Sequence, residues 1–541
     1  MNGIVKIPKL INEPVRAYAP GSNETLNLKS KLQELKSKTT DIPMYIGGQK
    51  IFTNEKIEMH PPHEKNYVLG TYNKGNAQHI NDAINAALAT KVSWANMPWE
   101  SRAAIFLKAA ELLAGPFRDR MNAATMLAQS KNAMQAEIDA SCEMIDFFRF
   151  NVQYMSEIYA QQPPENSPGV WNQLEYRPLE GFVFALSPFN FTSIAANLCA
   201  APAMMGNTVV WKPSETQIYS AQVIMDLYKE AGLPDGVINL IYVDGPTTGD
   251  VIFNHRDFAG IHFTGSTGVF RQIWKTIGNN IEKYRSYPRI VGETGGKDFI
   301  MVHKSADVDA VNTAMVRGAF EFQGQKCSAA SRAYVPQSMW TELKPKLIDT
   351  TNSLKMGTTE DFSNFINAVI DQKAFNKITS FITAVKESND ASVIAGGDFS
   401  DSEGYFIRPT VIEAKDPKYT TMCEELFGPV LTIYVYEDDK YEETLKMLDD
   451  TSEYALTGAI LCKDREQINV ALHALRNSAG NFYINDKPTG AVVGQQPFGG
   501  ARGSGTNDKA GAPINLMRWT SMRTIKETFV SPTSYEYPFH S

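Results

Sequence analysis

The sequence predicts an α/β protein whose parallel sheets are covered by helices on both faces. Three observations support this fold class. The 541 residues are too many for one hydrophobic core, so two or more domains are expected. Several short apolar runs lack the polar alternation of a half-exposed strand, which is typical of strands buried on both faces. Helical patterns follow these runs, as in repeated strand–loop–helix units.

Helices are expected before the first strand series. Apolar residues recur at helical spacing between Glu100 and Tyr159, and the Pro- and Asn-rich stretch 162–169 then ends the pattern. From Gly181 onward we expect four strand–helix units. Their strands are Phe182–Leu186, Thr208–Trp211, Ile238–Val243 and Gly260–Thr264, and their helices are Ala195–Met205, Gln217–Ala231, Gly249–Phe253 and Val269–Ile277.

A second series of such units is expected from Asp298 to about Asn485. In sheets of this kind, ligands bind beyond the carboxyl ends of the strands. The last residues, 518–530, alternate enough to form a strand that pairs outside the main body. The strands of the second series include Phe299–Val302, Arg332–Val335 and Val430–Val435.

Composition excludes several classes of protein. Hydrophobic residues make up 43% and charged residues 21%, as in an ordinary soluble globular protein. The net charge of -8 disfavours nucleic-acid binding, which usually needs a basic stripe. The 5 cysteines are widely spaced and form no CxxC pair, which indicates free thiols in a reducing compartment. The histidines show no metal-ligand spacing, so we expect no metal site.

We expect a cytoplasmic protein without a membrane segment. The first residues show neither a secretory apolar region nor the Arg-rich pattern of a transit peptide. The longest apolar region, 181–211, is interrupted by proline and asparagine residues, whereas a membrane span needs about 20 largely uninterrupted apolar residues.

A thiol and a carboxylate are the most informative candidate groups. Cys327 lies in the short polar turn 324–328, and Glu293 begins a glycine turn. A nucleophilic cysteine needs an accessible site that favours thiolate, and the flanking Lys326 and Ser328 argue against a buried structural thiol. A glutamate in a turn is more often simply exposed to water. We predict that this thiol and this carboxylate meet in one cleft as nucleophile and base.

The loops after the first strands carry groups suited to a dinucleotide. Lys212 and Glu215 follow one strand, and a carboxylate there can accept hydrogen bonds from ribose hydroxyls while repelling a 2′-phosphate, which favours NAD. The turn Gly265–Gly268 can present N–H groups to a pyrophosphate, although Gly and Ser are also common in structural turns. Asn190 is either a donor to a developing oxyanion or an ordinary N-cap.

Six motifs in this order resemble the aldehyde dehydrogenase superfamily over nearly the whole chain. They are Ser187–Asn190, Lys212–Glu215, Phe263–Ser266, Glu293–Lys297, Gly324–Cys327 and Glu425–Pro429. A closer resemblance is to the branch that oxidises L-glutamate γ-semialdehyde, formed from delta-1-pyrroline-5-carboxylate, to L-glutamate in the second step of proline catabolism. The segments that carry it are Asp146–Asn151, Gly480–Lys487, Val493–Arg502 and Arg518–Ser521.

The resemblance implies three structural parts. They are a Rossmann-like NAD-binding domain (1–155 and 180–293), an α/β catalytic domain (294–500), and a small β oligomerisation flap with the C-terminal tail (156–179 and 516–541). In relatives the flap crosses onto a partner subunit, so a homodimer or a higher homo-oligomer is expected. Eukaryotic relatives lie in the mitochondrial matrix.

The resemblance also implies roles for individual residues. The Cys327 thiolate would attack the aldehyde, Asn190 and the Cys327 N–H would hold the oxyanion, and Glu293 would activate the water that hydrolyses the thioester. NAD would lie against Ser187, Lys212, Gly265, Ser266, Thr267, Gly268, Val269 and Glu425, with Glu215 and Phe427 nearby. The substrate would lie against Ser328, Gly490, Ala491, Phe191, Phe498 and Glu143.

Three alternatives stay open at this point. Another semialdehyde, such as succinic semialdehyde, would use the same catalytic set, and only the loop 489–491 separates the two substrates. A catalytically silent structural protein on this fold would be expected to lack the nucleophile or the base, and both are present. A CoA-acylating dehydrogenase would typically lack the deacylating base that Glu293 supplies.

Overall fold

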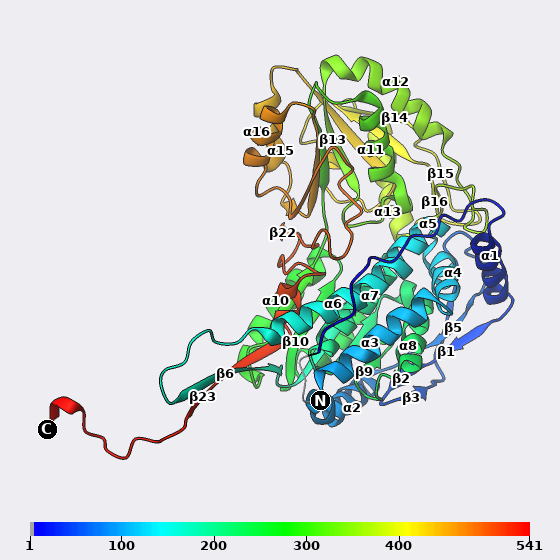
Figure 1. Ribbon diagram of the computed structural model, residues 1–541. Coiled ribbons are helices and arrows are strands. Elements are labelled where there is room, and N and C mark those ends of the chain that lie inside the picture. Colours follow the sequence, from blue (N-terminus) through cyan, green and yellow to red (C-terminus); the bar gives the residue numbers. More distant parts are fainter. Residues whose placement is uncertain (1–4, 541) are drawn as a thin grey trace.

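The computed structural model describes residues 5–540 and places them in two α/β bodies and a projecting β-ribbon (Figure 1). The first body contains a seven-stranded sheet in the order β11-β10-β7-β8-β9-β2-β3. Strands β7 to β11 run parallel, and β2 pairs antiparallel with both β9 and β3. The strands are β2 (Met44–Ile46), β3 (Gln49–Ile51), β7 (Phe182–Ser187), β8 (Val209–Pro213), β9 (Ile238–Leu240), β10 (Phe258–Thr264) and β11 (Arg289–Glu293).

Helices cover this sheet because its parallel strands are apolar on both faces. The region predicted to be helical before the first strand series contains α3, α4, α5, a π-helical segment η1, and α6, where α3 and α6 pack together. The helices of the first body are α1 (Asn23–Lys36), α2 (Ala77–Asn96), α3 (Trp99–Ala114), α4 (Arg118–Gln129), α5 (Ala133–Ala136), η1 (Glu137–Cys142), α6 (Glu143–Ala160), α7 (Thr192–Met204), α8 (Ile218–Ala231), α9 (Gly245–Ile252) and α10 (Thr267–Asn279).

The second body contains another seven-stranded sheet, in the order β14-β17-β18-β13-β12-β20-β21. The expected parallel series is confirmed, and an antiparallel edge strand, β14, was not predicted. The strands are β12 (Asp298–Val302), β13 (Ala330–Pro336), β14 (Ala391–Ala395), β17 (Thr410–Ala414), β18 (Val430–Tyr436), β20 (Thr457–Leu461) and β21 (Asn481–Ile484). The helices are α11 (Val308–Phe320), α12 (Gln337–Ser353), α13 (Gln372–Lys386), α14 (Thr420–Cys423), α15 (Tyr441–Asp450) and α16 (Arg465–Ala474).

A two-stranded antiparallel ribbon projects from the main body (Figure 1). Strands β6 (Val170–Pro178) and β23 (Thr520–Thr528) pair along their whole length. The expected terminal strand is therefore confirmed. The segment expected to open the flap at residue 156 is still helical, because α6 continues to Ala160.

The remaining elements are short. A three-stranded sheet near the N-terminus, in the order β1-β5-β4, was not predicted. No helix among residues 5–540 is long and apolar enough to cross a membrane. The short elements are β1 (Thr40–Ile42), β4 (Lys56–Met59), β5 (Gly70–Asn73), β15 (Phe399–Ser400), β16 (Phe406–Ile407), β19 (Tyr454–Ala455), β22 (Ala501–Arg502) and α17 (Pro513–Met517).

Candidate active site

The carboxyl ends of four neighbouring strands lie side by side in the first sheet. Leu186 of β7 is in register with Lys212 of β8 and with Phe263 of β10. One residue further, Thr264 of β10 is in register with Glu293, the last residue of β11. The motifs that follow these strands therefore meet at one edge of the sheet, where parallel sheets bind their ligands.

Cys327 and Glu293 line the same cavity. Glu143, at the start of α6, and Phe498 line it as well, together with residues of α7 and β10. The structure thus brings together the thiol and the carboxylate that the sequence singled out. A nucleophile and a base in one enclosed space can form and then hydrolyse a covalent acyl intermediate.

The Cys327 turn is buried, and the prediction of an accessible thiol was wrong. Lys326, Cys327 and Ser328 are only 6%, 7% and 5% exposed. The polar neighbours do not need water, because each has a partner inside the protein. The Lys326 ammonium lies 3.5 Å from the Asp139 carboxylate, and Ser328 Oγ shares a 2.8 Å hydrogen bond with Thr489 Oγ1.

The pKa of the Cys327 thiol is raised well above its usual value. Burial is the main cause, and the nearby carboxyl groups of Asp298 and Glu293 add to it. At neutral pH the resting thiol therefore carries its proton, which has to leave before the sulfur can attack.

Glu293 is held by the loop that carries Phe498. The N–H of Gly500 donates to Glu293 Oε2 at 2.9 Å. Burial raises the pKa of Glu293 well above its usual value, while the Gly500 N–H and the Lys509 ammonium act in the opposite direction. Hydrolysis uses the ionised form of this carboxyl group, which can take a proton from a water molecule in the cavity.

Asn190 is fastened to the Cys327 turn. Its Nδ2 donates to the carbonyl of Gln325 at 3.1 Å, and its Oδ1 is buried without a hydrogen-bond partner. The amide therefore lies beside the nucleophile, where an N–H donor can stabilise negative charge on a carbonyl oxygen.

We expect Asn190→Ala to lower kcat by about 100- to 1000-fold, roughly 3–4 kcal/mol of barrier, because the oxyanion loses a donor. KM should change much less. Steady-state NADH formation measures both values, and a thermal melt checks that the variant is folded. A folded variant with wild-type kcat would contradict this role.

The residues predicted to contact substrate are only partly gathered around the cavity. Through Ser328 and Thr489, the Cys327 turn is joined to the loop that contains Gly490 and Ala491. Gly490 has a φ of +101°, which glycine adopts without strain. Of the predicted substrate residues, Glu143 and Phe498 line the cavity, whereas Ser328, Gly490, Ala491 and Phe191 do not. The ring of Phe191 lies 4.4 Å from the Lys131 ammonium.

Glu143 is a predicted substrate contact whose carboxyl group is buried. It lines the cavity and accepts a 2.5 Å hydrogen bond from Ser193 Oγ. Burial raises the pKa of Glu143 to about 8, and Asp139 contributes in the same direction. The group is therefore mostly protonated near neutral pH and can both donate and accept hydrogen bonds.

Several predicted cofactor residues surround the glycine turn after Glu293. The N–H of Gly295 donates to Thr267 Oγ1 at 3.3 Å, and the N–H of Gly296 donates to Glu425 Oε1 at 2.9 Å. Thr267 opens α10, whose N-cap Ser266 accepts from the Val269 N–H. The start of α10 and Glu425 therefore both contact the turn Gly295–Gly296. The remaining residues of this group are Gly265, Gly268 and Phe427, whose ring packs edge-on against Phe189.

Lys212 and Glu215 line a second, smaller pocket at the end of β8, together with Asp244. The Lys212 ammonium is buried and has one weak contact, 3.4 Å to the Pro213 carbonyl, while Glu215 is exposed. Burial lowers the pKa of Lys212. A lysine whose ammonium still has hydrogen-bond donors to offer, next to an exposed carboxylate, can bind the hydroxyls of a ribose.

Ser187 lies at the same edge of the sheet, but its side chain already has a structural partner. The residue is 3% exposed, and its Oγ accepts a 2.9 Å hydrogen bond from Trp211 Nε1. Its carbonyl accepts from the Ser214 N–H. A cofactor role for Ser187 would therefore use the hydroxyl as a donor.

A buried charge cluster next to the site was not predicted. Lys131 is fully buried, donates to Asp139 Oδ2 at 2.7 Å, and lies 4.2 Å from the ring centre of Phe322. Asp139 also faces Lys326. The cluster fixes the turn that carries Cys327. No local signal distinguishes Lys131 from the lysines on the surface, because the aromatic rings that cover it, Phe191 and Phe322, come from distant segments.

One group of side chains within residues 5–540 has the spacing of metal ligands: His63, Glu64 and Glu360. Lys36 Nζ donates to both carboxylates, at 2.6 Å and 2.5 Å. An ammonium group therefore occupies the position in which these carboxylates would hold a cation.

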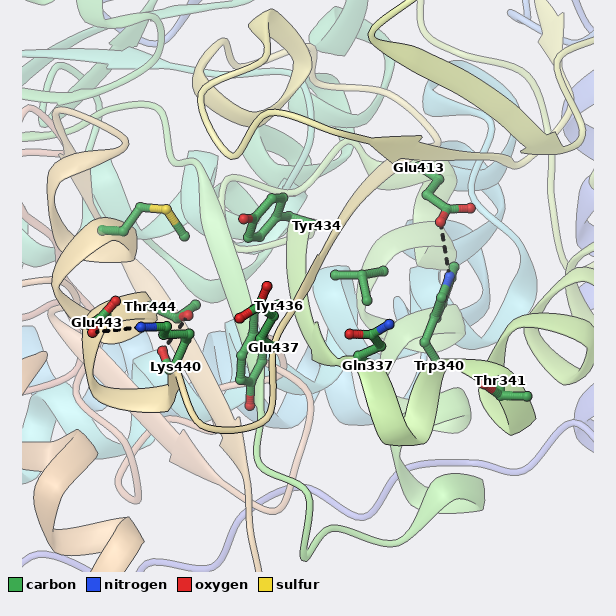
Figure 2. Close-up of a pocket in the computed structure, with 12 residues that line it drawn as sticks. Gln337, Trp340, Thr341, Glu413, Tyr434, Tyr436, Glu437, Lys440, Glu443 and Thr444 are labelled. Carbon is green, nitrogen blue, oxygen red and sulfur yellow. Dashed lines mark hydrogen bonds and ion pairs between the residues drawn. The ribbon is translucent and has the colours of Figure 1, made fainter.

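A surface groove lies in the second body, between α12 and α15 (Figure 2). Trp340 Nε1 donates to Glu413 at 3.0 Å, and Lys440 pairs with Glu443 at 3.3 Å. No predicted site residue lines this groove. It is therefore separate from the cavity at Cys327.

Comparisons with known proteins identify the family. The model of the aldehyde dehydrogenase family matches residues 51–525. The chain is 53% identical over 535 residues to the mitochondrial delta-1-pyrroline-5-carboxylate dehydrogenase of Dictyostelium discoideum, covering 98% of this chain and 96% of that protein.

Solved structures of similar proteins have the same fold as this chain. The delta-pyrroline-5-carboxylate dehydrogenase of Mycobacterium tuberculosis, bound with NAD, superposes with a TM-score of 0.96 at 51% identity, and 100% of both chains is covered. Proline utilization A from Bdellovibrio bacteriovorus superposes with a TM-score of 0.91 at 28% identity, covering 98% of this chain and 55% of that one.

Proposed function

Because the chain belongs to the aldehyde dehydrogenase family, we propose that it oxidises L-glutamate γ-semialdehyde to L-glutamate with NAD as the hydride acceptor. The observation that carries the proposal is the shared cavity of Cys327 and Glu293 at the carboxyl edge of the first sheet. The relatives named as delta-1-pyrroline-5-carboxylate dehydrogenases support the choice of substrate, since they match almost the whole chain.

The residues around the strand ends fit a dinucleotide. The under-bonded Lys212 ammonium and the exposed Glu215 carboxylate match ribose hydroxyls, and the negative charge of Glu215 disfavours the 2′-phosphate of NADP. The N-terminus of α10 offers N–H groups to a pyrophosphate. When bound, NAD accepts the hydride that leaves the substrate carbon.

The chain's own groups perform the remaining steps. The Cys327 thiol gives its proton to water, and the sulfur bonds to the aldehyde carbon while the Asn190 amide and the Cys327 N–H hold the oxyanion. After oxidation the carbon is a thioester. Glu293 then takes a proton from water, the hydroxide adds to the thioester, and the C–S bond breaks. The leaving thiolate takes the proton from Glu293, so the products are L-glutamate and the free thiol.

Substrate selection is assigned to the loop 489–491. Its N–H groups and the adjacent Ser328 can hold the α-carboxylate of the substrate, and Phe498 can pack on the aliphatic chain. Position 491 is alanine and supplies no hydroxyl, so the anchoring depends mainly on the backbone. Glu143 is assigned to the α-amino group.

The test is a comparison of two substrates. NADH formation is followed with L-glutamate γ-semialdehyde and with succinic semialdehyde, and the product is identified by mass spectrometry. We expect a clear preference in kcat/KM for the first substrate and L-glutamate as its product. A preference for succinic semialdehyde would assign the protein to a different substrate.

We further propose that two copies associate through the β6–β23 ribbon. The ribbon projects from the body in Figure 1 and exposes large apolar side chains, including Trp171 (51%) and Met522 (52%). Exposed apolar surface on a projecting element is typical of a subunit interface.

All 5 cysteines are free, which supports a reducing compartment such as the cytoplasm.

The double variant Trp171→Glu/Met522→Glu is expected to shift a dimer to monomers, because charge replaces apolar contact area. Light scattering after gel filtration measures the mass. Val92→Glu is the matched control, since Val92 is 67% exposed on α2, outside the ribbon. A wild-type mass for the double variant would refute the interface.

A further inference from the structure

The segment between residue 5 and α1 lies across the first body without forming a helix or strand (dark blue in Figure 1). Glu13 and Pro14 fix it to the helices beneath. The N–H of Glu13 donates to Asp146 Oδ1 at 2.8 Å, and Arg149 Nη1 pairs with the Glu13 carboxylate at 2.8 Å. Arg118 Nη2 donates to the Pro14 carbonyl at 2.8 Å. The position of this N-terminal arm is therefore determined by α4 and α6.

Asn12 connects this arm to the far end of the chain. Its Nδ2 donates both to Asp146 Oδ2 at 2.7 Å and to the carbonyl of Val493 at 2.8 Å. Its Oδ1 accepts from Gln495 Nε2 at 3.0 Å. One amide thus makes two hydrogen bonds to the segment 489–498 and one to α6. An amide whose donors and acceptor are all engaged is held in a single orientation.

The segment 489–498 contains no helix or strand, and its conformation depends on contacts at its ends and middle. At one end Thr489 bonds to Ser328, and at the other Phe498 pairs with Ala510. Between them most residues are exposed, while Val493 is 6% exposed. The contacts of Asn12 fall in this middle part, at Val493 and Gln495, shortly after Ala491.

We propose that Asn12 is a positioning residue that holds the segment 489–498 in the conformation that receives the α-carboxylate of the substrate. This inference rests on the proposed function, because it takes Gly490 and Ala491 as the carboxylate anchor. Asn12 does not line the cavity at Cys327. It acts through Val493 and Gln495 on recognition of the carboxylate, and not on the chemistry at the aldehyde.

The test separates recognition from chemistry with two aldehydes. Asn12→Ala should raise KM for L-glutamate γ-semialdehyde by about tenfold, as expected for the loss of two hydrogen bonds, with kcat nearly unchanged. KM for propionaldehyde, which has no carboxylate, should stay at the wild-type value. A loss of packing that merely loosened the active site would raise both KM values together.

Two further variants complete the design. Gln495→Ala removes only the side chain that donates to Asn12 from the exposed part of the loop. It should raise KM for L-glutamate γ-semialdehyde as well. In the double variant with Asn12→Ala, KM should rise little further. Arg16→Ala is the matched control, because its side chain joins the arm to Asp119 and makes no contact with the loop. We expect Arg16→Ala to leave both KM values unchanged.

The outcomes are distinct. A rise in KM confined to the carboxylate-bearing aldehyde supports the inference. The inference is overturned if Asn12→Ala leaves KM unchanged or raises KM equally for both aldehydes. The proposed function would still stand in that case, provided that the wild-type protein oxidises L-glutamate γ-semialdehyde. Failure of the wild-type protein to oxidise this substrate overturns the proposed function instead.

Discussion

Cys327→Ala is expected to lower kcat by at least about a thousandfold, because the enzyme loses the atom that bonds to the substrate. Cys327 lines the cavity with Glu293, and no other cysteine lines that cavity. Binding of NAD should survive, since the predicted cofactor residues Lys212, Glu215 and Glu425 are untouched. NADH formation measures turnover, and calorimetry measures NAD binding.

Cys462→Ala provides the control for this substitution. Cys462 is also a buried free cysteine, but it lies in the core of the second body, away from the cavity. This variant should keep wild-type turnover. Substantial dehydrogenase activity in Cys327→Ala would show that another group forms the covalent bond.

Glu293→Gln should produce an enzyme that reacts once and then stops. The amide can still accept the hydrogen bond that Gly500 donates at 2.9 Å, so the local structure is kept, but the amide cannot take a proton from water. Steady-state kcat should fall by about 100- to 10,000-fold, the usual contribution of a general base. Stopped-flow measurement should show a burst of about one NADH per site, the fingerprint of an accumulating acyl-enzyme.

Mass spectrometry of the stalled enzyme should find the acyl group on Cys327. Glu443→Gln is the control, because Glu443 is a glutamate of the separate surface groove on α15. Full steady-state turnover in Glu293→Gln would remove Glu293 from the hydrolysis step. The absence of any burst would place its role before hydride transfer.

Local sequence patterns predict strands β7, β8, β9 and β10 of the first sheet, but not β2, β3 and β11. β7 was expected at 182–186 and spans Phe182–Ser187, because an unbroken apolar run ends there at a proline. The expected strand 238–243 is shorter in the structure, since β9 ends at Leu240. Beyond it the Tyr242 carbonyl accepts from the Gly75 N–H, which belongs to a distant segment. Strand ends of this kind depend on partners that a local pattern does not contain.

Contacts with distant segments also limit how much of the site can be predicted from the sequence. The meeting of Cys327 and Glu293 in one cavity was predicted from their polar turns and from family motifs. The burial of the Cys327 turn was not, because the charge of Lys326 is compensated by Asp139 from a π-helical segment far away in the chain. Asn12 was not singled out either, since its importance appears only once the two ends of the chain are seen together.

The pairing of β6 with β23 has a consequence for biosynthesis. Val170 is in register with Thr528, so β6 leaves the ribosome long before its partner has been made. During that interval β6 is an unpaired edge, the kind of element that recruits strands from other nascent chains. Completing the fold also requires closure of a loop that spans most of the polypeptide, a slow event for a contact of such high sequence separation. The ribbon is therefore expected to assemble late in folding, and β6 needs protection from other chains until β23 has paired with it.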